Sequence, residues 1–90
     1  MPETRVQIVN PLGLHARAAG QLVRLAGNYR SSIFVKRSDQ PTTVDARSIF
    51  SLLSLGAGAG AFIDVLVEGD DADEALAAVA DIVTRGFGEI

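Results

Sequence analysis

The only histidine of this 90-residue chain lies in a short segment whose residue types could bind and transfer an anionic group. His15 follows Gly13 and precedes Arg17, between a β-like run at residues 6–9 and a helix-like run at residues 16–26. We therefore expect His15 at the start of a helix, where the first backbone N–H groups lack partners and the helix dipole is positive. Such a helix start binds anions. The imidazole adds a nucleophilic nitrogen, and Arg17 adds a charge-assisted donor.

The alternative is that His15 is an ordinary polar residue at a helix start, and local spacing leaves the two interpretations nearly even. The Gly13 turn, the exposed helix start and Arg17 favour a reactive histidine. The helix dipole also disfavours the protonated ring, which keeps the imidazole nucleophilic. Arg24, seven residues after Arg17, lies on the same side of the helix and is expected to be solvated surface.

Length and composition narrow the function class. The chain has the size of one domain, residues 1–90, and 48% hydrophobic residues are enough for a core. One histidine and no cysteine argue against disulfides and metal sites. The sequence shows no membrane span and no signal peptide, which predicts a cytoplasmic protein. The net charge of −3 gives no overall case for binding nucleic acid, although acidic residues crowd the C-terminal third and most basic residues lie in the first half.

Hydrophobic periodicity predicts the element order βαββαβα. Strands are expected at residues 5–9, 32–36, 42–45 and 61–67, and helices at 16–26, at 49–55 and from Asp71 to Gly86. The predicted class is α+β, a four-stranded antiparallel sheet with three helices on one face. The other face stays wet, with outward positions expected for Arg5, Gln7, Lys36, Asp64 and Glu68.

The helix ends carry recognisable signals. Ser48 is a predicted N-cap, and Asp71 with Glu74 resembles a capping box. Gly27 and Asn28 tolerate the left-handed conformation that often ends a helix, and Gly56 and Gly86 are the other predicted ends. The glycine-rich run 56–60 lacks the Lys and Ser/Thr of a phosphate loop, so it is interpreted as a connector.

Ser48 allows a second interpretation. Spacing alone favours a cap, but a phosphate on Ser48 would be stabilised at the helix start, with Arg47 beside it. Ile49, Phe50 and Leu53 on the same short helix are either satellite core or an exposed docking patch.

Several motifs in order resemble the HPr family, the histidine-containing phosphocarriers of the bacterial sugar phosphotransferase system. The segment from Gly13 to Ala19 resembles the active-site signature. Tyr29, Ser31, Ile33 and Val35 resemble the second strand, the segment from Ala46 to Gly56 resembles the regulatory-serine region, and Glu68, Gly69 and Asp71 resemble the entry to the last helix. The resemblance implies an open-faced β-sandwich.

The resemblance also implies roles. His15 would take a phosphoryl group on Nδ1 from phosphorylated enzyme I and pass it to sugar-specific IIA domains, acting as a carrier rather than an enzyme. Arg17 and the backbone N–H groups of Ala16, Arg17 and Ala18 would stabilise the phosphate. Ser48 would be the substrate of a kinase/phosphatase, and its phosphorylated form a corepressor of a transcriptional regulator. The implied docking residues are Leu14, Ala18, Arg24, Arg47, Ile49, Phe50 and Leu53, in a monomer that needs no cofactor or metal.

The chain departs from the family pattern at Ala18, where proline is usual and would make the first helical turn more rigid. Two other function classes stay open. One is a regulatory paralogue, acting through phospho-Ser48 or in a nitrogen-related relay; retention of His15 and Arg17 favours the carrier over it. The other is a ferredoxin-like ligand or RNA module, which would need a longer second helix than residues 49–55. Neither the downstream sugars nor the existence of a Ser48 kinase follows from the sequence.

Overall fold

A computed structural model of the protein describes residues 2–89. Its element order is β1 (Glu3–Gln7), α1 (Ala16–Ala26), β2 (Ser32–Arg37), β3 (Thr43–Asp45), α2 (Ile49–Ser54), β4 (Phe62–Glu68), α3 (Ala72–Thr84) and the 3-10 turn η1 (Gly86–Gly88). The βαββαβα prediction is confirmed. The first strand covers Glu3–Gln7 rather than residues 5–9, and η1 was not expected. The bounds of the other strands and of α2 differ from the prediction by one residue.

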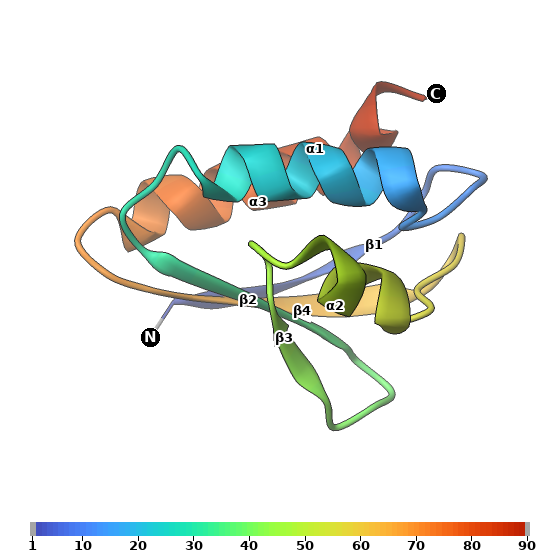
Figure 1. The fold of residues 1–90 in the computed structure, drawn as a ribbon, viewed down its shortest axis with the longest axis horizontal. Coiled ribbons are helices and arrows are strands. Elements are labelled where there is room, and N and C mark those ends of the chain that lie inside the picture. The colour runs from blue at the N-terminus through green and yellow to red at the C-terminus, as the bar shows by residue number, and fades with distance from the viewer. Residues whose placement is uncertain (1, 90) are drawn as a thin grey trace.

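The sheet has the strand order β1-β4-β2-β3, and all its pairs are antiparallel. The last strand of the chain, β4, is therefore central, with Val6 opposite Ile63 on one side and Val35 opposite Val65 on the other. The helices α1 and α3 run side by side over one face of the sheet, and α2 lies beside α1 (Figure 1). The predicted α+β class is confirmed.

Alternation along the strands explains the core. Every second residue faces the helices and is buried, and the inward set is Val6, Ile33, Val35, Ile63, Val65 and Val67. The amphipathic helices complete the core with Ala19, Leu22 and Ala26 from α1 and Ala75, Val79 and Val83 from α3.

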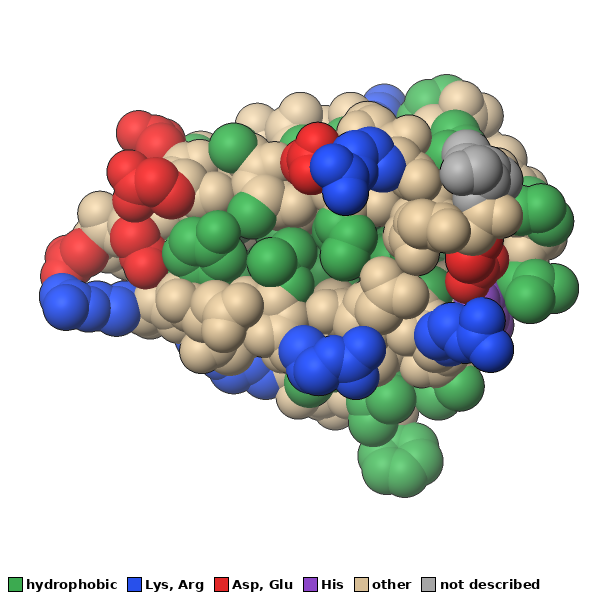
Figure 2. Space-filling view, turned by 90° about the horizontal axis from the view of Figure 1, so that it is seen from above, with side chains coloured by type: hydrophobic (Ala, Val, Ile, Leu, Met, Phe, Trp, Pro, Cys, Tyr) green, Lys and Arg blue, Asp and Glu red, His purple; other side chains and the backbone are tan. Residues whose placement is uncertain are grey.

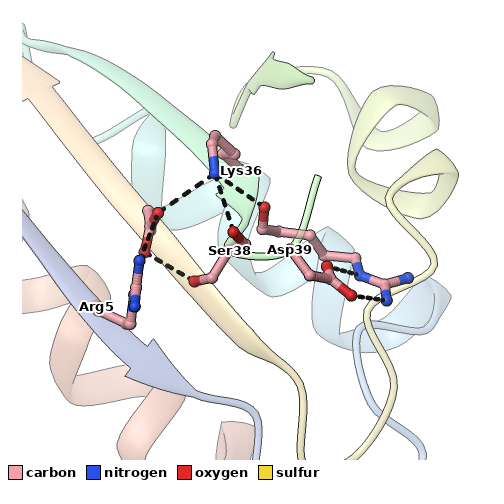
Figure 3. A network of polar contacts seen from close by, with 6 residues as sticks. Arg5, Lys36, Ser38 and Asp39 are labelled. Carbon is pink, nitrogen blue, oxygen red and sulfur yellow. Dashed lines mark hydrogen bonds and ion pairs between the residues drawn. The ribbon is translucent and has the colours of Figure 1, made fainter. Parts of the chain in front are cut away.

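The opposite face of the sheet carries the polar residues predicted for it, together with Phe34, Leu66 and the half-exposed Phe62. A network around Asp64 links the neighbouring strands β1, β4 and β2 on this face (Figure 3). Asp64 binds Arg5 Nε at 2.7 Å through Oδ1 and Lys36 Nζ at 3.5 Å through Oδ2. The Ser38 hydroxyl donates to the same carboxylate at 2.8 Å. These contacts, chiefly the hydrogen bond from Arg5, lower the pKa of Asp64 to about 2.

The helix ends confirm some predictions and correct others. Ser48 caps α2 by accepting the N–H of Ser51 at 3.4 Å, and Gly56 has the expected left-handed φ of 64°. Helix α1 ends at Gly27 as expected, but φ there is −66°, so the expectation of a left-handed residue was wrong.

The predicted capping box at Asp71 was also wrong. The Asp71 side chain makes no cap hydrogen bond to α3. Its carboxylate accepts instead from the backbone N–H groups of Arg30 and Ser31, each at 2.9 Å, because the α1–β2 connection packs directly against this helix start. None of the helices within residues 2–89 is both long and apolar enough to cross a bilayer.

Candidate functional site

His15 is the N-cap residue of α1. Its backbone is extended, with φ −82° and ψ −178°, and its carbonyl accepts the first helical hydrogen bond from Ala19 N at 2.8 Å. The backbone N–H of Arg17 donates to ring Nδ1 at 3.3 Å. Because Nδ1 accepts this hydrogen bond, it carries the lone pair, and the ring proton belongs on Nε2.

The turn before His15 depends on Gly13. Its φ is 66°, and a Cβ atom here would lie 2.7 Å from the Ala57 carbonyl oxygen. The close approach allows Leu14 N to donate to that same oxygen at 2.8 Å. The glycine-rich connector therefore supports the histidine turn, and only glycine fits at position 13.

The sequence reading missed two partners of His15. Nε2 of the ring contacts Glu89 Oε2 at 2.5 Å. Asn10 is fully buried, and its Nδ2 donates both to Glu89 Oε1 at 3.1 Å and to the Gly13 carbonyl at 2.7 Å. Both partners are acceptors, which fixes the orientation of the Asn10 amide. The hydrogen bonds from His15 and then Asn10, together with the charge of Arg17, lower the pKa of Glu89 below its usual value of 4.5.

An unusual backbone segment carries Glu89 to the histidine. Gly86, Phe87 and Gly88 have successive φ values of 65°, 55° and 76°. Phe87 is buried, and a non-glycine residue with this φ is strained. The aromatic ring thus anchors a tight turn, which explains why the last residues fold back over the start of α1. A phenylalanine between two glycines, followed by a carboxylate, is the signal that could have identified this partner.

Arg17 contributes to the site in two ways. Its backbone N–H contacts the ring, while its side chain is exposed and makes no hydrogen bond or ion pair within residues 2–89. A shallow depression of about 420 Å³ lies beside it, lined by Pro11, Leu12, Arg17, Gly88 and Glu89. On the face shown in Figure 2, the histidine, in purple, lies beside acidic and basic side chains at one end, whereas most of the acidic side chains visible there lie at the other end.

The predicted phosphate-binding N–H groups belong to Ala16, Arg17 and Ala18, the three residues that precede the first helical donor, Ala19. The side chain of Ala18 is fully buried, and Leu14 is only 5% exposed. Both were expected to dock a partner. That expectation was wrong for their side chains, because they fill the core beneath the helix start.

The predicted docking patch on α2, made of Ile49, Phe50 and Leu53, lies next to α1. A methyl group on Gly20 of α1 would lie 4.0 Å from Ile49 Cδ1 and 3.7 Å from Arg24 Nη1, so the start of α2 faces the middle of α1. Phe50 is 83% exposed and Leu53 is 36% exposed. Arg24 and these two side chains are therefore available at the surface, whereas Ile49 is half-buried between the helices.

Arg47 differs from its predicted place beside Ser48. Its Nη2 donates to the carbonyl groups of Ala26, Tyr29 and Ser31 at 3.3, 2.8 and 3.2 Å. The guanidinium thus closes the end of α1, where carbonyl groups lack helical partners. Arg47 as a whole is nevertheless exposed, so its roles as a phosphate partner and docking group remain predictions.

The site as a whole can hold and release a negatively charged group. The His15 side chain is 24% exposed, so its ring is partly accessible rather than fully open, and the helix start and Arg17 supply positive potential. Within residues 2–89, no three potential metal-ligand side chains lie together.

Comparison with known proteins places this geometry in a family. Residues 2–85 match the family described as "PTS HPr component phosphorylation site". The chain is 39% identical to a phosphocarrier protein HPr from Pseudomonas aeruginosa, over 99% of this chain and 98% of that protein. It is also 39% identical to a phosphocarrier protein NPr from Klebsiella oxytoca, over 93% of this chain and 92% of that protein.

Solved structures agree with the fold. A crystal structure of HPr-C-His from Thermoanaerobacter tengcongensis superposes with a TM-score of 0.92 and 38% identity, covering 100% of this chain and 99% of that one. A crystal structure of an HPr dimer from the same organism covers 99% of this chain and 100% of that one, with a TM-score of 0.75 and 38% identity. The chain belongs to the HPr family of phosphotransferase-system phosphocarriers.

Proposed function

We propose that the protein carries a phosphoryl group on Nδ1 of His15, received from phosphorylated enzyme I and passed to a IIA domain. The observation that carries this proposal is the position of Nδ1, which accepts the Arg17 N–H at the start of α1 and bears the lone pair. In the transfer, this lone pair attacks phosphorus while the donor leaves with its bonding electrons. The helix start and Arg17 stabilise the charge of the phosphoryl group.

The same geometry supports a carrier rather than an enzyme with its own turnover. The nearest carboxylate, Glu89, contacts Nε2 on the opposite side of the ring from Nδ1. It is therefore poorly placed to activate water against a phosphoryl group on Nδ1. A phosphohistidine protected in this way persists long enough to meet an acceptor.

The test is incubation with phosphoenolpyruvate and enzyme I. Acid-labile, base-stable phosphate is expected on the wild type and not on His15→Ala. Equal labelling of the two proteins, or no labelling of the wild type, would reject the proposal. Size-exclusion chromatography of the labelled protein also tests the expectation of a monomer, since one related structure is described as an HPr dimer.

A second function, a nitrogen-related relay, is favoured by the relatives named NPr. The two relays differ in the acceptor rather than in the chemistry at His15. Labelled protein offered to a sugar-specific IIA domain and, separately, to a nitrogen-related IIA domain distinguishes them by the transfer rate. The sugar relay is our first proposal, and either relay would operate in the cytoplasm, where phosphorylated enzyme I is expected.

Regulation at Ser48 belongs to the same proposal. The Ser48 hydroxyl caps α2 two residues before the exposed Phe50, so a dianionic phosphate there would add charge to the docking face. We expect Ser48→Asp to slow transfer from enzyme I. An unchanged rate would argue against docking through this face, and a failure of a bacterial HPr kinase/phosphatase to label Ser48 would argue against the modification itself.

A further inference from the structure

The side-chain carboxylate of Glu89 contacts Nε2, one of the two ring nitrogens of His15 that could react. Its contact with Nε2 pairs the ring proton with a carboxylate, and the Arg17 N–H group marks Nδ1 as the nitrogen with the lone pair. The two ring nitrogens of histidine are chemically similar nucleophiles, and which of them reacts is set by what the other one binds. The ring of His15 is held at both.

Glu89 is itself held in place. The buried Asn10 amide donates to Oε1 of Glu89 while His15 contacts Oε2, so both oxygens of the carboxylate have a partner. The buried Phe87, with its left-handed φ, fixes the turn that brings the chain back over α1. Only 14% of the Glu89 side chain is exposed.

We infer that Glu89 is a positioning residue that selects Nδ1 of His15 as the phosphoryl acceptor by holding the proton on Nε2. The inference rests on the proposed carrier function and adds a residue to it. Glu89 does not touch the phosphoryl group; it acts through the imidazole, as second partners of reactive histidines do.

Glu89 has a second effect, which is to compensate the charge that the ring gains on phosphorylation. When the Nδ1 lone pair forms the N–P bond, the ring keeps its Nε2 proton and gains a positive charge. The charged groups that face this ring are Glu89 from the C-terminal turn and Arg17 from α1, and Asn10 is neutral. Of these, only the carboxylate compensates the new charge. Keeping the proton on Nε2 also preserves a neutral imidazole as the leaving group when the phosphoryl group is passed on.

Chemical phosphorylation with phosphoramidate tests, without enzyme I, which ring nitrogen of His15 accepts the phosphoryl group. In its ammonio form, the reagent transfers its phosphoryl group to a ring nitrogen, while the reagent's P–N bond breaks and ammonia leaves with the bonding pair. The product is analysed by ³¹P and ¹⁵N NMR, which identify the phosphorylated nitrogen. The variants are Glu89→Ala, Glu89→Gln and, as a matched control far from the site, Glu68→Gln on β4.

We expect the wild type and Glu68→Gln to react at Nδ1. In Glu89→Ala the ratio of Nε2 to Nδ1 product should rise by about tenfold, the change that corresponds to losing one hydrogen bond to a charged acceptor. Glu89→Gln should retain most of the selection, because its amide oxygen still accepts the Nε2 proton.

The outcomes separate this inference from the carrier function. Equal product ratios in the wild type and Glu89→Ala, or reaction of the wild type at Nε2 or at neither nitrogen, would overturn the role of Glu89. Labelling by phosphoenolpyruvate and enzyme I tests the carrier function separately, and its result does not depend on the role of Glu89. Amide NMR spectra of the variants check that each remains folded, and a change confined to the ring nitrogens is one that a merely structural role would not produce.

Discussion

Ser31 and Asp71 lie 40 residues apart and are joined by a hydrogen bond of 2.5 Å from the Ser31 hydroxyl to Asp71 Oδ1. The Asp71 carboxylate also accepts the backbone N–H groups of Arg30 and Ser31. One side chain at the start of α3 therefore accepts the hydrogen bonds of three donors in the turn between α1 and β2. This contact fixes the end of the molecule opposite His15 and is independent of the phosphoryl site.

The first prediction concerns acid stability. The hydrogen bond from Ser31 and those from the backbone lower the pKa of Asp71 to about 2, from an ordinary value of 3.8. A lowered pKa in the folded state stabilises the protein above the ordinary value, and this stabilisation is lost as the pH falls through about 2. Asp71→Asn should therefore flatten the fall in the free energy of unfolding across this window, as measured by urea denaturation.

The matched control is Asp70→Asn, since Asp70 is exposed and its side chain makes no hydrogen bond in the described part of the chain. Asp64 titrates in the same window with a pKa of about 2, so the comparison must use the difference between each variant and the wild type. If Asp70→Asn and Asp71→Asn had the same pH dependence, the assigned role of Asp71 would be wrong.

The second prediction is that Gly69→Ala destabilises the protein strongly. Gly69 has φ 148°, and a Cβ atom there would lie 2.6 Å from Ser31 Cα and 2.5 Å from its hydroxyl oxygen. Backbone strain and steric overlap together should lower the free energy of unfolding by about 3 kcal/mol. Gly60→Ala separates the two causes, because Gly60 has φ 89° with open space around it and should lose only about 1 kcal/mol. Equal losses in thermal or urea denaturation would exclude the overlap.

The third prediction concerns Arg47, whose guanidinium closes the end of α1. Arg47→Ala should lower the free energy of unfolding by about 1 to 2 kcal/mol, because three carbonyl groups lose a charged donor. Arg47→Lys should recover part of this loss. Neither variant is expected to prevent labelling of His15 by enzyme I. Loss of labelling in a protein with an unchanged amide spectrum would instead support a docking role for Arg47.

Local patterns were sufficient for the fold and for the position of His15 at the start of a helix. The strands have a period-two pattern and the helices are amphipathic, so each has one apolar face. Packing the helices on one face of the sheet buries all of these apolar faces together. The start of α1 at His15 was likewise a local signal, since it depends on a turn and a run of helix-forming residues. The cap of Ser48 on α2 is the same kind of information.

Contacts between distant segments were not predictable in this way. Asp71 has the local spacing of a capping box, but its carboxylate binds two backbone N–H groups of Arg30 and Ser31 and the Ser31 hydroxyl instead of its own helix. Glu89 was missed because its role depends on a backbone turn at Phe87 with a φ that few residues adopt. The burial of Leu14 likewise depends on how the histidine turn packs on the sheet, which spacing does not reveal.

The fourth prediction links the glycine-rich connector to the histidine. Gly13→Ala would place its Cβ 2.7 Å from both the Ala57 oxygen and Gly58 Cα, so the turn or the connector must move. We expect the free energy of unfolding to fall by about 2 to 3 kcal/mol, and His15 labelling to slow. Gly58→Ala is the matched control, because nothing lies within 4 Å of its added methyl group. A normal labelling rate in a folded Gly13→Ala protein would show that the turn does not position the ring.

The fifth prediction concerns Phe87, whose buried ring should stabilise the C-terminal turn while its left-handed backbone should destabilise it. Its buried ring should make Phe87→Ala less stable by about 3 kcal/mol, the usual cost of emptying such a site. At φ 55°, however, glycine is better tolerated than alanine, so Phe87→Gly should be more stable than Phe87→Ala by about 1 kcal/mol. This order is the reverse of that expected at an ordinary position, where glycine is the less stable of the two.

Both Phe87 variants should also release Glu89, because the turn that carries the carboxylate loses its anchor. The ¹⁵N shift of His15 Nε2 should then move toward that of Glu89→Ala, while amide signals of the sheet stay in place. If Phe87→Ala proved more stable than Phe87→Gly, the left-handed backbone at this position would be refuted. If Nε2 kept its wild-type shift in both variants, Asn10 alone would be sufficient to hold the carboxylate on the ring.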